Sequence, residues 1–455
     1  MKSLLISGDR SGAGKTSVTL AIAGLLSRES VVQTYKVAMD YIDTSYLAGV
    51  THRPSYNLDT FVQTAEETSG LFSYGSSGAD YGIVEGVRGL YEGLEALTDV
   101  GSTASIAKRF GLPVVLVINA RSITRSAAAL VKGFQAFDPD VRIKGVILNN
   151  VMGARHVQKA KTAIEEYCGI PVLGAVPRQP EMELAMRHLG LVPYREGSEN
   201  AEFHERIEVI TDVIGEYVDI DAVRALAEDV TPVPNAVTGF LQRTPGTGKK
   251  IAVAYDEAFN FYYGELAAVL GGLGAEVVRF SPIHDRLPDA DGYIFGGGYP
   301  ELYPAELEAN DSLREAVRET AKNDVPIYAE CGGLMYLTRS IAFPDGWQNH
   351  SPGDRYAMCG VFAGDTRMPV KKSLGYVTGT ASLPGGEFSF RGHEFHYSAV
   401  TMDADARYRY ALSRGNGIAG GKDGAMVHHT LGAYTHLMPV SSRAILGSFF
   451  GLESV

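Results

Sequence analysis

The sequence is poor in cysteine and tryptophan and has no long apolar run. Its 455 residues include three cysteines and one tryptophan. The cysteines (Cys168, Cys331 and Cys359) are too few for a disulfide framework and lack CxxC spacing. No apolar run reaches membrane-spanning length, and an apolar segment at residues 4–6 leaves no room for a signal peptide before it. We therefore expect a cytoplasmic protein with no membrane partner.

Positive charge is also scarce. The 41 Lys and Arg residues face 53 Asp and Glu residues, which gives a net charge of −12. This balance disfavours a nucleic-acid partner, although a local basic patch would be compatible with it. A chain of 455 residues is too long for one hydrophobic core, so we expect two domains.

Glycine is abundant, with 52 residues, and its first cluster follows the apolar segment 4–6. The segment 4–6 is followed by glycines, by Lys15-Thr16 and by the apolar run 18–26. This is the strand, phosphate loop and helix order of a P-loop nucleotide site. Backbone amides would surround the phosphates, Lys15 would reach the outer ones, and Thr16 would bind Mg²⁺. The predicted ATP-binding residues are Gly12, Gly14, Lys15, Thr16 and Ser17.

This phosphate loop departs from the usual pattern at one position. Asp9 stands where the first glycine is expected, and Gly8 lies one residue earlier. The alternative is an ordinary glycine-rich turn between a strand and a helix. The correct flanking strand and helix favour nucleotide binding.

Polar side chains end several predicted strands, where open α/β sheets bind ligands. Asp40 and Asp43 follow the strand 31–37, and Glu85 ends the strand 81–86. We predict that Thr16, Asp40 and Glu85 hold Mg²⁺. Asn119 and Asn149 end the apolar strands 113–119 and 145–150, and their amides are predicted to contact the nucleotide base.

The alternation of strands and helix-length segments predicts a doubly wound parallel α/β domain. Residues 52–59 are interpreted as a polar loop. A stretch rich in Pro, Gly and Thr then separates two domains. The predicted boundaries are 1–230 for the first domain, 231–249 for the linker and 250–455 for a second α/β domain.

The second domain contains a strand, Cys331, two glycines and a helix-like run within residues 325–337. This is the layout of a nucleophile elbow, and the helix N-terminus is expected to lower the thiol pKa. The predicted base is His436, with His393, His396, His428 and His429 as competitors. Gly297 and Gly298 are predicted to form an oxyanion hole. Cys168 and Cys359 are interpreted as small buried hydrophobes.

With these motifs in place, the chain resembles the a,c-diamide synthases of tetrapyrrole biosynthesis, which act on cobyrinate or Ni-sirohydrochlorin. The resemblance covers nearly the whole length. It rests on Ser11–Thr16, Asp40–Asp43, Arg53–Ser55, Asn57–Asp59, Glu85–Gly93, Gly101–Ala104, Gly296–Glu301, Ala329–Tyr336 and Arg391–Ser398.

The resemblance implies an ATP-dependent domain similar to dethiobiotin synthetase, followed by a class I-like glutaminase. ATP would activate a carboxylate as an acyl phosphate. Cys331, activated by His436, would release ammonia from glutamine to displace the phosphate. Family enzymes lack the acid two residues after the histidine, and Met438 stands there. What orients the imidazole is left open.

The resemblance also places substrate-binding residues in the first domain: Tyr41, Asp43, Arg88, Tyr91, Glu92 and Ser102. The chain departs from the family at Ala38-Met39, Thr44 and Glu92, which favours the methanogen type that amidates Ni-sirohydrochlorin over the cobyrinate type. The metal of the macrocycle and the oligomeric state stay open, with a homodimer among the options.

Two alternatives compete with this interpretation. A cobyric acid synthase would amidate other side chains of the macrocycle, but residues 391–398 are typical of a,c-diamide synthases. A partitioning-type P-loop ATPase would have no glutaminase. Such proteins usually carry a lysine near the start of the loop, where this chain has Asp9 and Arg10.

Overall fold

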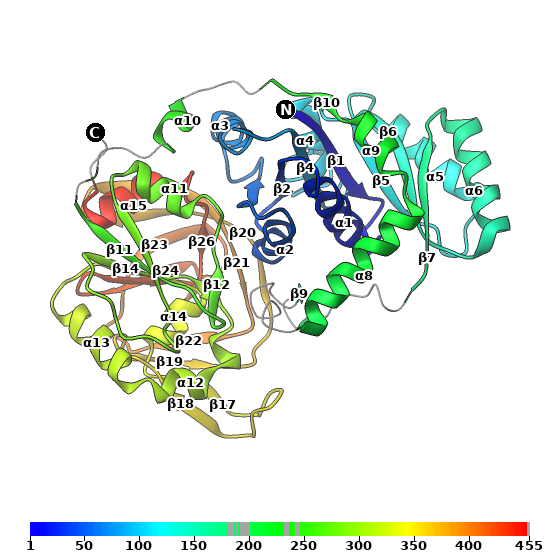
Figure 1. The fold of residues 1–455 in the computed structure, drawn as a ribbon. Helices are drawn as coiled ribbons and strands as arrows, with labels where there is room; N and C mark the ends of the chain where they lie inside the picture. Colours follow the sequence, from blue (N-terminus) through cyan, green and yellow to red (C-terminus); the bar gives the residue numbers. More distant parts are fainter. Residues whose placement is uncertain are drawn as a thin grey trace. The chain divides into compact units, whose positions relative to one another are not determined.

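The computed structural model describes residues 1–179, 186–187, 190–191, 201–231, 236–241, 246 and 248–452 (Figure 1). They form two compact units, Met1–Thr238 and Gly239–Val455, and each is described by itself. The described part of the predicted linker, residues 231–249, contains helix α10 (Ala236–Phe240). Residues 232–235, 242–245 and 247 of that linker lie outside the described residues, so the linker stays a prediction.

The first unit is built on a parallel sheet with the strand order β3-β2-β4-β1-β5-β6-β7. Its strands form from continuous apolar runs, because such a sheet is buried on both faces. The strands are β1 (Lys2–Gly8), β2 (Val32–Val37), β3 (Tyr56–Leu58), β4 (Tyr81–Gly89), β5 (Val114–Asn119), β6 (Ile143–Val151) and β7 (Val172–Pro177). Strand β10 (Glu228–Asp229) pairs antiparallel with β1, and β8 (Met186–Arg187) pairs with β9 (Gly190–Leu191).

Helices separate the strands, as the predicted doubly wound fold requires. They are α1 (Lys15–Ser27), α2 (Tyr41–Thr51), α3 (Ala65–Gly75), α4 (Thr103–Phe110), α5 (Arg125–Phe137), α6 (Gly153–Cys168), α8 (Ala201–Tyr217) and α9 (Ile220–Leu226). Helix α1 packs against α8 (Figure 1), and their apolar side chains form one core with β1, β4 and β5. Strand β1 lies between β4 and β5, so the loop after it opens at the point where strand order reverses, which is where such sheets bind ligands.

The prediction of a polar loop at residues 52–59 is wrong in part. Tyr56–Leu58 form strand β3, which pairs in parallel with β2. Asn57 is fully buried, and its Nδ2 donates to the carbonyls of Ala38 and Asp40 at 2.8 and 2.9 Å. Polar side chains of β3 are therefore buried because their hydrogen bonds hold the segment that follows β2. For this reason no hydrophobic period marks β3 in the sequence.

The second unit contains a sheet with the strand order β13-β11-β14-β16-β25-β24-β23-β20-β21-β26. The pairs from β13 to β25 are parallel and the later ones antiparallel. These strands are β11 (Lys250–Ala254), β13 (Glu276–Phe280), β14 (Gly292–Phe295), β16 (Ile327–Glu330), β20 (Ser373–Leu383), β21 (Gly386–His396), β23 (Arg407–Arg414), β24 (Lys422–Val427), β25 (Thr430–Ala433) and β26 (His436–Leu437).

Two smaller sheets complete the second unit. They comprise β12 (Phe259–Phe261) with β15 (Gly297–Gly298), and β17 (Ser340–Phe343), β18 (Asp354–Ala357), β19 (Gly364–Arg367) and β22 (Ala399–Met402). The helices are α11 (Leu266–Gly272), the 3-10 helix η2 (Pro300–Leu302), α12 (Pro304–Ala309), α13 (Asp311–Lys322), α14 (Gly332–Leu337) and α15 (Arg443–Phe450). The fold class, a P-loop parallel sheet followed by a second α/β domain, is as predicted. In the described residues no helix combines the length and apolar character needed to cross a bilayer.

Candidate active sites

The phosphate loop lies between β1 and α1, and its backbone requires glycine. Gly14 has φ 92°, and a Cβ there would collide with the Asn149 side chain. That same amide donates from Nδ2 to the Ala13 carbonyl at 2.9 Å. Asn149 therefore fixes the loop from the neighbouring strand, and its predicted contact with the nucleotide base stays a prediction.

Asp9, the residue that departs from the usual pattern, also holds the loop in place. Its carboxylate forms an ion pair with Arg10 at 2.7 Å and accepts from the backbone amide of Asn119 at 3.4 Å. The Asn119 side chain accepts from Asn150 Nδ2 at 3.2 Å. The first turn of the loop is thus tied to the end of β5 by polar contacts, in place of the tight turn that a glycine would allow.

Buried charges gather at the start of α1. Thr16 Oγ1 donates to Glu85 Oε1 at 2.7 Å. Lys36 Nζ donates to the same Glu85 oxygen at 2.8 Å and to Asp43 Oδ2 at 2.5 Å. The side chains of Lys36 and Glu85 are 1% and 0% exposed, so water does not screen their charges. The structure thus brings the predicted residues Thr16, Asp43 and Glu85 together.

Lys36 was missed by the sequence analysis. It lies in β2, a central strand of a parallel sheet, where a charged side chain is rare unless it is paired. A lysine inside a predicted buried strand was the available signal, and the surrounding residues Gln33, Thr34 and Tyr35 obscured it.

The pKa values in this cluster follow from burial and mutual charge. Burial disfavours the charged Lys36, but Asp43 and Glu85 outweigh it and raise the pKa of Lys36. Burial raises the pKa of Glu85 despite Lys36, and burial with Lys36 lowers the pKa of Lys15. Burial opposes the ionised form of Asp43, yet Lys36 and Lys15 hold the pKa of this carboxyl below its usual range. Burial and Asp43 raise the pKa of Asp40 to about 6.

Asp40 performs a different task from its acidic neighbours. It is the N-cap of α2, and its Oδ1 accepts from the amides of Ile42 and Asp43 at 3.0 Å each. One of its carboxylate oxygens is therefore committed to the helix. Glu85 differs, because its Oε2 is buried without a hydrogen-bond partner among the described residues.

Three of the predicted substrate-binding side chains instead hold backbone of the first unit. The Tyr91 hydroxyl donates to the carbonyl of Phe134 in α5 at 2.6 Å. Glu92 Oε2 accepts from the amide of Gly89 at 3.3 Å, and Ser102 caps α4. These contacts give the three side chains structural roles, and their substrate roles stay predictions.

The other predicted substrate residues border the phosphate loop. Arg88 is exposed, has φ 48° and precedes Gly89, which pairs with Gly8 at the end of β1. Tyr41 is the buried first residue of α2, directly after the capping Asp40. Arg88 is thus an accessible cation beside the loop, as an anionic substrate would require.

Cys331 lies on a strained turn between β16 and α14. Its φ of 47° falls in the left-handed region, which is unusual for a side chain other than glycine. Its amide donates to the Ala433 carbonyl at 2.7 Å. A Cβ on Gly333 would collide with the carbonyl of Phe295, so the turn needs glycine directly after Gly332. The predicted strand, elbow and helix are therefore present.

The expected lowering of the Cys331 pKa is wrong. Burial raises the pKa of this thiol, and the carboxylates of Glu301 and Glu330 raise it further. The amide of Gly332 acts in the opposite direction, as expected at a helix N-terminus, but its effect is smaller. The resting thiol is therefore protonated, and a base is needed to generate the nucleophile.

His436 lies beside Glu330, the residue that precedes Cys331. It lies in β26, three residues after β25, and is 1% exposed. Its Nδ1 lies 3.3 Å from Glu330 Oε2. Its ring stacks on that of His393, with centroids 5.0 Å apart, because the two residues are paired across β21 and β26.

The backbone that carries His436 is also fixed. Asp423 is fully buried and accepts from the amides of Tyr434 and Thr435 at 3.0 and 2.9 Å and from the Thr435 hydroxyl at 2.7 Å. These bonds anchor the two residues that precede His436.

The competing histidines have other surroundings. His396 stacks on Tyr434, and its Nδ1 lies 2.8 Å from the Ser398 carbonyl. His428 lies 3.8 Å from Asp324, and the ring of His429 packs against Phe449. Burial and the neighbouring His436 hold the pKa of His393 well below its usual range, so its imidazole is neutral at pH 7.

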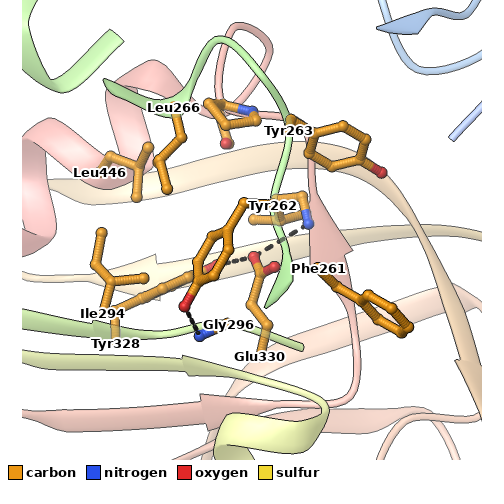
Figure 2. A pocket seen from close by; sticks show the side chains of 12 residues that line it. Phe261, Tyr262, Tyr263, Leu266, Ile294, Gly296, Tyr328, Glu330 and Leu446 are labelled. Atoms are coloured by element: carbon orange, nitrogen blue, oxygen red, sulfur yellow. Dashed lines mark hydrogen bonds between the residues drawn. The ribbon is translucent and has the colours of Figure 1, made fainter. Parts of the chain in front are cut away.

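The predicted oxyanion-hole glycines lie next to His436 and next to Gly332, the residue that follows Cys331. A Cβ on Gly297 would lie 2.6 Å from His436 Cε1, and a Cβ on Gly332 would lie 3.1 Å from the Gly298 nitrogen. The amide of Gly296 is already used, because it donates to the Tyr262 hydroxyl at 2.7 Å (Figure 2). The role of Gly297 and Gly298 stays a prediction supported by this proximity.

Comparisons with known proteins match both units. Residues 4–192 match the family described as the CobQ/CobB/MinD/ParA nucleotide binding domain, and residues 250–444 match the CobB/CobQ-like glutamine amidotransferase domain. The chain is 47% and 45% identical to the cobyrinate a,c-diamide synthases of Methanosarcina acetivorans and Methanosarcina barkeri, with 98% of this chain and 94% of each relative covered. The enzyme of that name from Methanothermobacter thermautotrophicus is 40% identical, with 98% of both chains covered.

Among solved structures, PurLQS from Thermotoga maritima aligns with 45% of this chain and 98% of its own at 12% identity. The TM-score of 0.33 is too low to support an argument.

Proposed function

Because this chain belongs to the cobyrinate a,c-diamide synthase family, we propose that it converts two carboxylates of cobyrinate, those of the a and c side chains, into amides. It is an ATP-dependent carbon–nitrogen ligase that takes its amide nitrogen from glutamine. Family membership and the amidotransferase domain argue against the partitioning-type ATPase considered above.

One observation supports the proposal more than any other. In each unit the side chains proposed to react follow the carboxyl ends of parallel strands. Lys15 and Thr16 follow β1, while Cys331 follows β16 and His436 follows β25. An amidotransferase needs these two chemistries: activation of a carboxylate and release of ammonia.

In the first unit, ATP would phosphorylate the substrate carboxylate to an acyl phosphate. Lys15 would bind the outer phosphates from the start of α1, and the loop amides around Gly14 would surround them. Arg88 would attract the anionic carboxylate before transfer. Asp43 would accept a proton from incoming ammonia or contact the metal.

Mg²⁺ would lie at Thr16 and Glu85, with Asp40 and Asp43 as further oxygen donors. The fit is supported by the buried and unpartnered Glu85 Oε2 and by three acidic side chains facing only two lysines. Mg²⁺ usually keeps several waters, so a site with few protein ligands suits it. Within the described residues no group of three or more His, Cys, Asp or Glu side chains is arranged to hold a metal ion, so Thr16 and Glu85 would be the direct ligands and water would complete the shell. The bound ion would neutralise phosphate charge during transfer.

In the second unit, Cys331 would attack the side-chain amide of glutamine and form a thioester, with His436 moving the proton from the thiol to the departing ammonia. Gly297 and Gly298 would donate to the developing oxyanion. Transfer of ammonia shielded from solvent would keep it unprotonated and the acyl phosphate unhydrolysed.

The substrate is tested by supplying cobyrinic acid and Ni-sirohydrochlorin in parallel with ATP, Mg²⁺ and glutamine. The expected result is a mass loss of about 1 Da per amidation, two amidations per cobyrinic acid, and no product when Lys15→Ala replaces the parent protein. Preferential amidation of Ni-sirohydrochlorin would replace the cobyrinate proposal. Ni-sirohydrochlorin as the substrate is favoured by the departures from the family pattern at Ala38, Met39, Thr44 and Glu92.

A further inference from the structure

A base that activates a cysteine needs a third group that fixes its orientation. The residue two positions after His436 is Met438, which is apolar and fully buried, so it supplies no such group. The orienting group must therefore come from another part of the second unit.

Glu330 occupies the required place. It directly precedes Cys331 at the end of β16, and its Oε2 lies 3.3 Å from His436 Nδ1. The two residues meet because β16 pairs in parallel with β25, with Glu330 opposite Ala433, three residues before His436. We propose that Glu330 is a positioning residue that orients the His436 imidazole for glutamine cleavage. This inference rests on the proposed roles of Cys331 and His436.

The carboxylate is itself held in place. Its Oε1 accepts from the Leu437 amide at 3.2 Å and from the Tyr328 hydroxyl at 3.0 Å. Figure 2 shows Glu330 next to Tyr328 and Tyr262 in a small pocket. Since Leu437 directly follows His436, one carboxylate bonds to the backbone beside the imidazole and faces the imidazole ring. One carboxylate oxygen is thus bonded to the backbone next to His436, and the other lies within 3.3 Å of its ring nitrogen.

A hydrogen bond from Nδ1 to Glu330 Oε2, which lies 3.3 Å away, would determine which ring nitrogen is basic. A carboxylate beside Nδ1 favours the tautomer with a proton on Nδ1, which leaves Nε2 free to accept the thiol proton. The thiolate sulfur then bonds to the amide carbon of glutamine, the carbon–nitrogen bond breaks, and the same proton passes to the leaving nitrogen to give ammonia. During this step Glu330 stabilises the positive imidazolium.

The surrounding groups are compatible with this role. The ring of His393 stacks on the imidazole of His436 and stays neutral, so it does not compete for the carboxylate as a second cation. Glu301 and Glu330 both raise the pKa of Cys331. Glu330 therefore disfavours the thiolate directly, and it promotes catalysis only through the base.

The test is the isosteric variant Glu330→Gln. Its amide can still accept from Leu437 and Tyr328, but it presents no charge to Nδ1 of His436. We expect kcat for glutamine hydrolysis to fall about 10²- to 10⁴-fold, with KM for glutamine changed less than about 3-fold. Amidation with free ammonia should stay at the parental rate.

Met438→Leu is the matched control, because it changes a buried neighbour of His436 at nearly constant volume and should alter kcat less than about 3-fold. Glu330→Asp, which keeps the charge one methylene shorter, should recover part of the rate. If Glu330→Gln does not fold, Glu330→Asp becomes the test variant, and the expected loss of kcat is then smaller.

A kcat within 3-fold of the parent in Glu330→Gln would overturn the inference. So would an equal loss of ammonia-dependent amidation, which would mean a structural role. Failure of the proposed glutaminase looks different: Cys331→Ser would then keep glutamine-dependent activity, whatever Glu330→Gln does.

Discussion

The ammonium nitrogen of Lys36 lies 2.8 Å from Glu85 Oε1, and both side chains are buried in the first unit. Thr16 donates to the same oxygen at 2.7 Å. Without a bound metal, the lysine thus compensates the charge of two carboxylates, those of Glu85 and Asp43. Removal of the lysine leaves the carboxylate charge without a partner in a medium of low dielectric constant, which lowers the stability of the fold.

Replacement of the lysine is therefore expected to destabilise the first unit. Lys36→Met should lower its free energy of unfolding by about 3–5 kcal/mol, because Glu85 and Asp43 lose their buried partner. The double variant Lys36→Met/Glu85→Gln should regain part of this loss, since one of the two unpaired charges is gone. Thermal unfolding in Mg²⁺-free buffer measures both. Additive effects of the two substitutions would contradict the pairing.

Asp40 gives the stability of the first unit a defined pH dependence. The pKa of this carboxyl is about 6 in the folded chain and ordinarily 3.8, so between these values the folded chain binds more protons than the unfolded chain. Its contribution to the free energy of unfolding therefore falls as pH rises from about 4 to 6 and stays low above that range.

Asp40→Asn keeps the capping oxygen and removes the charge. We expect it to stabilise the first unit at pH 7–8 by at most about 3 kcal/mol, and the gain should vanish as pH falls toward 4. Melting temperatures in Mg²⁺-free buffer from pH 4.5 to 8 test this expectation. Asp140→Asn removes an exposed charge from the same unit and serves as the control. A gain independent of pH would contradict the assignment.

Gly14 should tolerate no side chain. Gly14→Ala combines a positive φ with a collision against Asn149, so we expect loss of ATP-dependent amidation by more than about 100-fold. Gly111 also has a positive φ, of 60°, but has open space around it. Gly111→Ala should therefore cost only about 1 kcal/mol of stability and leave activity intact. Equal kinetic losses in both variants would mean that backbone strain alone decides the effect.

Arg88 should matter for the macrocycle more than for the other substrates. Arg88→Ala is expected to raise KM for the tetrapyrrole about 10-fold or more, because a charge-assisted bond to a carboxylate is lost, with KM for ATP and glutamine nearly unchanged. Steady-state kinetics with each substrate varied in turn measure the three constants. A parallel rise of all three would place the tetrapyrrole pocket elsewhere.

The sequence predicted those parts of the fold that leave a local pattern. Strands such as β1, β5 and β6 are continuous apolar runs because a parallel sheet covers both of their faces. Strand β3 left no such pattern, because its burial depends on the partner strand β2 and on the hydrogen bonds of Asn57. The antiparallel half of the second unit was likewise not predicted.

The candidate sites divide in the same way. Lys15 and Cys331 were found because turn chemistry places them at fixed offsets from glycine. Lys36 was missed because its carboxylate partners lie on other elements. Glu330 was missed because its contact with His436 spans more than a hundred residues. The substrate role of Tyr91 stays a prediction, and the bond from its hydroxyl to α5 could not be inferred from motif membership.

The protonated thiol of Cys331 also bears on how the enzyme survives when glutamine is absent. Peroxides oxidise thiolates far faster than thiols, and burial, with the carboxylates of Glu301 and Glu330, raises the pKa of this thiol. An idle enzyme therefore exposes no reactive sulfur to oxidants. The proposed nucleophile is thus protected from the oxidative damage that a permanently ionised thiol would suffer.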